Sequence, residues 1–174
     1  MKTKYLLIFI MLFPGFLFAQ RRNKIIKDSN SEPMLIGYCT REVFNDSSFA
    51  SWFNPEYESY YPDSSAIEAL KKDMRNIDIT IVMGSWCSDS QWHVPDFYKI
   101  LDKINYPSDK VTLIAVNEDK KTEEDEIDTL NIKLVPSFIF YRDGSELGRI
   151  VESPEKSLEV DVLGILIKKK EISH

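Results

Sequence analysis

Cys87 is the residue best placed for chemistry in this sequence. It follows a run of β-branched and apolar residues, 79–83, and precedes a segment whose apolar residues have helical spacing. A cysteine at such a strand-to-helix turn lies at a helix N-terminus, where free backbone N–H groups and the helix dipole favour a thiolate over a thiol. A lone cysteine is more often a small buried apolar residue, but its position at the turn favours a reactive thiol.

The residues around this turn resemble the active-site motif of the thioredoxin family. Trp86, Cys87 and Ser90 match the family's W-C-x-x-C pattern with a serine in place of the second cysteine. Pro95 falls where the family's active-site helix carries a proline. Farther along the chain, residues 135–141 are similar to the family's cis-proline strand. The two signatures in this order are far more specific than either one alone.

The resemblance implies an α/β fold: a thioredoxin-like three-layer α/β/α sandwich with a mixed central sheet and an extra N-terminal helical segment. We expect the thioredoxin-like domain to span residues 64–174, with residues 34–63 packed on it as an extension. Local patterns agree with this fold, since they predict parallel buried strands at 79–83 and 111–116 and a hairpin turn at Asp143-Gly144.

Helices are expected on both faces of this sheet. The acidic segment 117–128 is predicted to begin a helix between the second strand and the hairpin. N-cap residues predict further helices after Asp46 and Asp63, and Ser153 followed by a proline predicts the start of the last helix.

The resemblance assigns Cys87 as the catalytic nucleophile, because the first cysteine of the family's motif attacks a disulfide and the second resolves the mixed disulfide. Ser90 stands at the resolving position, and its hydroxyl is too weak an acid to expel a thiolate. We expect Ser90 instead to be a catalytic residue that donates a hydrogen bond to the Cys87 thiolate. Ile81 stands where many thioredoxins bury a carboxylate that serves the second cysteine, so both losses concern the same half-reaction.

Trp86, Val135 and Pro136 are the substrate-binding residues that the resemblance implies. A cis Val135–Pro136 bond would leave the Val135 backbone free to pair with an extended substrate segment beside the sulfur. The alternative is an ordinary proline at the start of a strand. His93 near Cys87 also suggests a Cys-His hydrolase, but no third orienting residue or oxyanion glycine accompanies the pair.

Three hypotheses for the function remain open at the level of sequence. The first is a monothiol enzyme that reduces or isomerises disulfides through a mixed disulfide on Cys87. The second is a non-catalytic thioredoxin-like module that binds exported proteins. The third is an enzyme in which Cys39, the second of only two cysteines, is a displaced resolving thiol.

Residues 1–19 are predicted to be a signal peptide. Lys2 and Lys4 precede an apolar run that is too short to span a membrane easily, and residues 17–19 suit a cleavage site. We therefore expect a periplasmic or extracellular protein without stable membrane insertion after processing. A retained N-terminal anchor is the alternative, because basic residues follow the cleavage site directly.

Composition excludes several functions. The formal net charge of −6 becomes more negative when the two lysines of residues 1–19 are removed, so nucleic acid is an unsuitable partner. Two cysteines and two histidines indicate neither a disulfide scaffold nor a metal site, and no cofactor is expected. We expect a monomer whose partners are exported proteins with thiols or disulfides, or small thiols.

Two segments lie between the signal peptide and the predicted domain. Residues 20–33 are polar and basic, which predicts a flexible arm. The extension at 34–63 begins with a predicted strand and is rich in aromatic side chains, among them Trp52 and Tyr60. Such a cluster can form a sugar or peptide platform, but packing against the core is the more common role.

Overall fold

The computed structural model describes residues 23–122 and 125–172, so the predicted signal peptide lies outside the described residues. Its strands form a six-stranded sheet in the order β1-β2-β4-β3-β5-β6. β3 and β4 are parallel, as the sequence predicts, and every other pair of neighbours is antiparallel. The strands are β1 (Lys24–Lys27), β2 (Pro33–Cys39), β3 (Asp78–Met83), β4 (Val111–Ala115), β5 (Ser137–Arg142) and β6 (Ser145–Val151).

The helices begin largely where their capping residues predict. The side chain of Asp46 accepts the Ser48 N–H at the start of α1, and that of Asp63 accepts the Ala66 N–H at the start of α2. The last helix starts at Leu158 rather than after Ser153. The α-helices are α1 (Ser47–Ser59), α2 (Ser64–Asp73), α3 (Ser88–Lys103) and α4 (Leu158–Ile172), and the 3-10 helices are η1 (Arg41–Asn45), η2 (Ser108–Lys110) and η3 (Asp125–Leu130).

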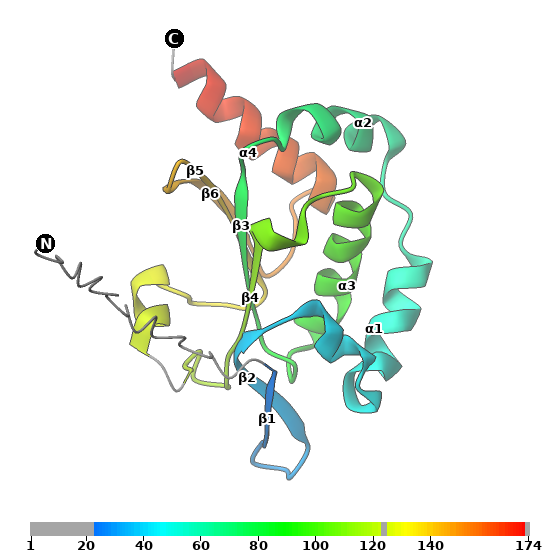
Figure 1. The fold of residues 1–174 in the computed structure, drawn as a ribbon, viewed down its shortest axis with the longest axis vertical. Coiled ribbons are helices and arrows are strands. Elements are labelled where there is room, and N and C mark those ends of the chain that lie inside the picture. The colour runs from blue at the N-terminus through cyan, green and yellow to red at the C-terminus, as the bar shows by residue number, and fades with distance from the viewer. Residues whose placement is uncertain (1–22, 123–124, 173–174) are drawn as a thin grey trace, which may run out of the picture.

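The sheet separates two apolar clusters of unequal size, and the four α-helices lie together on one side of it (Figure 1). The larger cluster joins them to Ile81, Leu113 and Phe138 of the sheet. The smaller cluster on the other face includes Val82, and η3 covers it with Ile127. The fold is thus an α/β fold whose third layer is a 3-10 helix.

The expectation of an α-helix between β4 and β5 is wrong. Within the described residues between these strands the helix that forms is η3, and among its described side chains Ile127 is buried and Leu130 is half-buried. An α-helix needs an apolar stripe that recurs over several turns, and this acidic segment does not provide one.

The expectation of a flexible arm at residues 20–33 is also wrong where the structure describes this segment, from residue 23 on, because β1 lies within it. β1 pairs with β2 from Lys24 opposite Ile36 to Lys27 opposite Pro33. The Asp28 carboxylate accepts backbone N–H groups two and four residues later, which closes the turn between the strands. The strand predicted at 34–39 is confirmed as β2, whose last residues pair with β4.

The aromatic residues of the extension pack against the core. Phe49 and Phe53 are buried, Trp52 and Tyr60 lie partly buried beside them, and Tyr61 is 87% exposed. The structure therefore gives most of this cluster a packing role.

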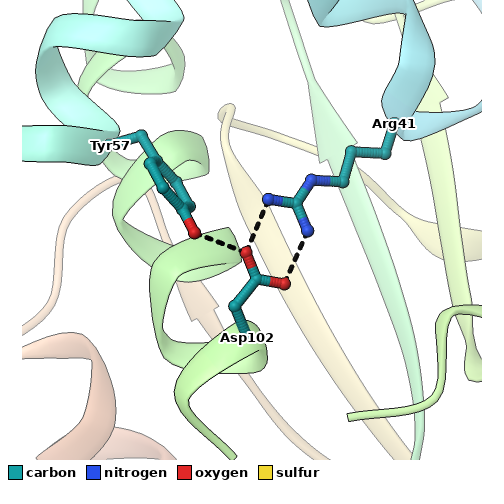
Figure 2. Close-up of polar contacts among 3 residues, drawn as sticks. All are labelled: Arg41, Tyr57 and Asp102. Atoms are coloured by element: carbon teal, nitrogen blue, oxygen red, sulfur yellow. Dashed lines mark hydrogen bonds and ion pairs between the residues drawn. The ribbon is translucent and has the colours of Figure 1, made fainter. Parts of the chain in front are cut away.

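Polar contacts fix the same region to α3. Arg41 of η1 forms two 2.6 Å hydrogen bonds to the Asp102 carboxylate of α3, and the Tyr57 hydroxyl of α1 donates a third at 2.6 Å (Figure 2). The Asp102 carboxylate thus joins η1, α1 and α3.

No helix within the described parts of the chain is long and apolar enough to cross a membrane.

Candidate active site

Cys87 lies between the end of β3 and the first residue of α3, as the sequence predicts. It is the N-cap residue of α3, with extended φ and ψ of −92° and 125°. The residue is partly exposed, and its carbonyl oxygen accepts the first helical hydrogen bond from the Gln91 N–H at 3.0 Å. Cys87 is therefore partly exposed and lies at the N-terminus of α3, where free backbone N–H groups occur, although its side chain does not cap the helix.

The turn before Cys87 is closed and tightly packed. The Cys87 N–H donates to the Gly84 carbonyl oxygen at 3.0 Å, and the Trp86 indole N–H donates to the Val116 carbonyl oxygen at 2.9 Å. The indole ring lies directly on Gly84, because a Cβ added to that glycine would come within 2.6 Å of it. The Lys120 ammonium lies 5.6 Å from the centre of the same ring, within cation–π distance.

The Val135–Pro136 bond is cis, as the resemblance implies. The Cys87 thiol donates to the Val135 carbonyl oxygen, with the sulfur 3.2 Å from that oxygen. Within the described residues the Val135 N–H has no hydrogen-bond partner. The structure thus brings together Trp86, Cys87, Val135 and Pro136, which were predicted from sequence positions far apart.

Ser90 is fully buried one helical turn after Cys87. Its hydroxyl oxygen accepts the Gly84 N–H at 3.2 Å. This bond uses an oxygen lone pair and leaves the hydroxyl proton to donate elsewhere. Ser90 therefore stabilises the turn through Gly84, and its predicted hydrogen bond to a Cys87 thiolate stays a prediction.

His93 faces along the helix rather than toward the thiol. Its Nδ1 lies 3.9 Å from the Asp96 carboxylate, one turn farther along α3. In the described contacts it has no bond to Cys87, so the geometry of a Cys-His hydrolase pair is not formed.

Cys39 lies on the opposite face of the sheet from Cys87. It is 7% exposed and belongs to the larger apolar cluster, whereas Cys87 packs against the smaller one. Burial raises the pKa of the Cys39 thiol from 9.0 to about 11, although backbone hydrogen bonds from Asn23 and Ala115 act in the opposite direction. Its sulfur lies 3.5 Å from the Gly37 carbonyl oxygen, and both cysteines are free thiols.

Two residues of the site were missed at the level of sequence. The Ser85 hydroxyl accepts the Leu35 N–H of β2 at 3.0 Å, and the Gln91 side-chain amide donates to the Ser85 carbonyl oxygen at 2.8 Å. No sequence signal marks the first of these bonds, since it joins residues 50 apart. Among the described His, Cys, Asp and Glu residues, no group of three is arranged to hold a metal ion.

The chain is similar in sequence to a thioredoxin-like protein. No family model matches the chain. It is 31% identical over 93 residues to the chloroplast thioredoxin-like protein HCF164 of Arabidopsis thaliana, a match that covers 52% of this chain and 34% of that protein. The chain thus spans about a third of the length of this curated relative.

Solved structures similar to this chain include two thioredoxins. One is oxidised thioredoxin O2 from Arabidopsis thaliana, with 20% identity, a TM-score of 0.37 and coverage of 60% of this chain and 83% of that one. Another is mitochondrial thioredoxin 3 from Saccharomyces cerevisiae, with 15% identity, a TM-score of 0.38 and coverage of 65% and 98%. A protein of unknown function from Pseudomonas aeruginosa, PA1234, has 18% identity, a TM-score of 0.44 and coverage of 70% and 71%.

The order and direction of strands β3 to β6 carry the assignment of the fold. They place a cysteine at the start of the helix after β3 and a cis-proline before β5, side by side at one edge of the sheet. On this ground, and with its sequence similarity to HCF164, the chain has a thioredoxin-like fold.

Proposed function

We propose that this protein acts on thiols and disulfides through Cys87 alone. The Cys87 thiolate attacks one sulfur of a substrate disulfide, forms a mixed disulfide with it and releases the other sulfur as a thiolate. A small thiol of the glutathione class, as its thiolate, then attacks the substrate sulfur of the mixed disulfide. Cys87 leaves as a thiolate, and the substrate departs as a mixed disulfide with the small thiol. A second molecule of the small thiol attacks that mixed disulfide, which releases the reduced substrate and the small thiol's own disulfide.

The hydrogen-bonding groups beside the sulfur support this proposal most directly. The Val135 carbonyl oxygen accepts the Cys87 thiol, and the Val135 N–H has no hydrogen-bond partner in the described structure. Val135 is 3% exposed, so we propose that an extended substrate segment reaches its backbone from the side of the partly exposed Cys87. An exposed apolar side chain adjoins this position, since Leu134, the residue before Val135, is 43% exposed.

The missing resolving thiol supports a monothiol cycle. Ser90 is buried at the resolving position, and Ile81 is fully buried where a proton-transferring carboxylate would lie. Cys39 is an unsuitable substitute, because it packs on the other face of the sheet and burial keeps it protonated near neutral pH. For Cys39 to resolve a mixed disulfide on Cys87, its thiol would have to move from one face of the sheet to the other.

A non-catalytic binding module is the second candidate function. The chain has Ser90 in place of a resolving thiol and Ile81 in place of a buried carboxylate. Both differences favour a binding module, since a protein that only binds exported proteins needs neither group. In that case substrate pairing at Val135 would persist without turnover.

Single-cysteine variants test these alternatives. Cys87→Ser should abolish glutathione-dependent reduction of a peptide disulfide, whereas the matched variant Cys39→Ser should retain it. Intact-mass spectrometry under non-reducing conditions should detect the substrate adduct on Cys87 in both the wild type and Cys39→Ser. Accumulation of that adduct only in Cys39→Ser would assign Cys39 the resolving role, and binding without any adduct would favour the binding module.

We also propose that the protein is exported, with exported thiol or disulfide proteins and small thiols as partners. The charge and length of residues 1–19 support this proposal. Mass spectrometry of the mature protein from its native compartment should find Gln20 as the first residue. An intact N-terminus in a membrane fraction would instead indicate a retained anchor.

A further inference from the structure

We propose that Ser85 is a positioning residue for Cys87, through which the N-terminal strand β2 controls where the thiol lies. The inference rests on the proposed function, because it concerns the reactivity of the same thiol. A buried side-chain hydroxyl joins the active-site turn directly to β2.

The position of β2 explains why this bond exists. The ladder between β2 and β4 runs from Cys39 opposite Leu113 to Gly37 opposite Ala115, where β4 ends. Leu35, two residues before Gly37, therefore has no strand residue to receive its N–H on that side. The Ser85 hydroxyl takes that place at 3.0 Å, so the active-site turn continues the edge of the sheet.

The hydrogen bond between Leu35 and Ser85 is buried. Leu35 is 0% exposed and Ser85 is 5% exposed, so water cannot easily replace the hydroxyl. If the hydroxyl is removed, the Leu35 N–H is left buried without a partner, and the backbone must move to satisfy it.

The backbone of Ser85 is also fixed, by a hydrogen bond from α3. Its carbonyl oxygen accepts the Gln91 amide from the first turn of α3 at 2.8 Å. Ser85 lies inside the turn that the Cys87 N–H closes onto Gly84, two residues before the sulfur. A shift of Ser85 therefore moves Cys87 relative to the Val135 carbonyl oxygen and to the N–H groups of α3.

The experiment measures the rate at which iodoacetamide alkylates Cys87 in the full chain, with the site identified by peptide mass spectrometry. We expect Ser85→Ala to lower this rate by about fivefold or more and to change its dependence on pH, because the sulfur shifts relative to the Val135 carbonyl oxygen and the start of α3. Ser85→Thr keeps the hydroxyl and should restore most of the rate. Gln91→Met, which has a similar shape but no donor, should lower it as well.

Thr40→Val is the matched control. It removes a hydroxyl just after β2 that accepts the Asn23 side-chain amide at 3.0 Å, without touching the active-site turn. Its alkylation rate and pH profile should equal those of the wild type.

Three results would overturn the proposal: an unchanged rate and pH profile in Ser85→Ala, an equal loss in Thr40→Val, or a wild-type rate in Gln91→Met. The Gln91 variant decides the matter even if Ser85→Ala does not fold, since Gln91 is only half-buried. Absent glutathione turnover in the wild type, together with the expected alkylation rates, would refute the proposed enzyme and leave the positioning role standing.

Discussion

The Cys87 sulfur lies 3.2 Å from the carbonyl oxygen of Val135, although 48 residues separate the two along the chain. The pairing of the strands that precede and follow them explains this contact. β3 and β5 are antiparallel neighbours, with Val82 opposite Ser137, so the turn after β3 meets the loop before β5. Any partner that reaches the sulfur therefore also meets the backbone of that loop.

Gly84→Ala should destabilise the protein and lower the alkylation rate of Cys87. The new Cβ would lie 2.6 Å from the Trp86 ring, which must move and lose its bond to the Val116 carbonyl oxygen. Overpacking of this kind costs about 1–3 kcal/mol in the free energy of unfolding, measurable by denaturant titration.

Gly164→Ala is the control for this variant, because a Cβ at Gly164 of α4 meets nothing within 4 Å. It should leave the protein as stable as the wild type or more stable by about 0.5–1 kcal/mol. Equal stability losses in the two variants would show that contact with Trp86 is not the cause.

Ser90→Cys should give the protein dithiol reductase activity, because it places a thiol at the resolving position of the motif. We expect reduction of insulin disulfides, measured by turbidity, to rise by about tenfold or more. Ser88→Cys, which adds a thiol at an exposed position beside Cys87, is the matched control and should give no such gain. No gain in Ser90→Cys would indicate that the apolar Ile81 blocks the second half-reaction by itself.

Cys39 should make the wild type lose stability at alkaline pH. Burial raises the pKa of its thiol from 9.0 to about 11, so between these values the folded chain holds a proton that the unfolded chain has lost. The stabilisation is complete below pH 9, and it falls by about 2 kcal/mol as the pH rises toward 11.

Cys39→Ala tests this pH dependence. Urea unfolding at a series of pH values should show a smaller alkaline loss of stability in the variant than in the wild type. Part of the loss should remain, because burial also raises the pKa values of Tyr60, Tyr98 and Tyr106. Identical slopes in both proteins would contradict a buried, protonated Cys39.

The ion pair between Arg41 and Asp102 should contribute modestly to stability. Burial raises the pKa of Asp102, but hydrogen bonds from Arg41 and Tyr57 more than offset it, so the net pKa is lowered. The stabilisation is therefore present above the ordinary carboxyl pKa and is lost as the pH falls below about 4. Because both side chains are about 40% exposed, we expect a coupling energy of only about 0.5–1 kcal/mol.

A double-mutant cycle with Arg41→Met and Asp102→Asn measures this coupling through urea unfolding at neutral pH. The same cycle on Lys71 and Glu68, an exposed pair of the same 2.6 Å length within α2, should give a smaller value. A larger coupling in the α2 pair would show that the contact with Tyr57 adds nothing.

The sequence by itself determined the features that depend on neighbouring residues. A β-branched run followed by a helical pattern places Cys87 at a turn, and Asp46 and Asp63 begin helices because their carboxylates reach N–H groups two or three residues later. The W-C-x-x-S motif and the Val135–Pro136 pair predicted the fold and the residues that gather at the site, because they match a known family.

Only the tertiary structure decided what depends on pairing between distant segments. Cys39 lies on the face opposite Cys87 because β2 pairs with β4 in one particular register, and a shift of one residue would reverse its side. Strand β1 and the bond from Leu35 to Ser85 likewise depend on which backbone groups the sheet leaves without partners. These partners lie far apart along the chain, so local patterns of apolar and polar residues do not predict them.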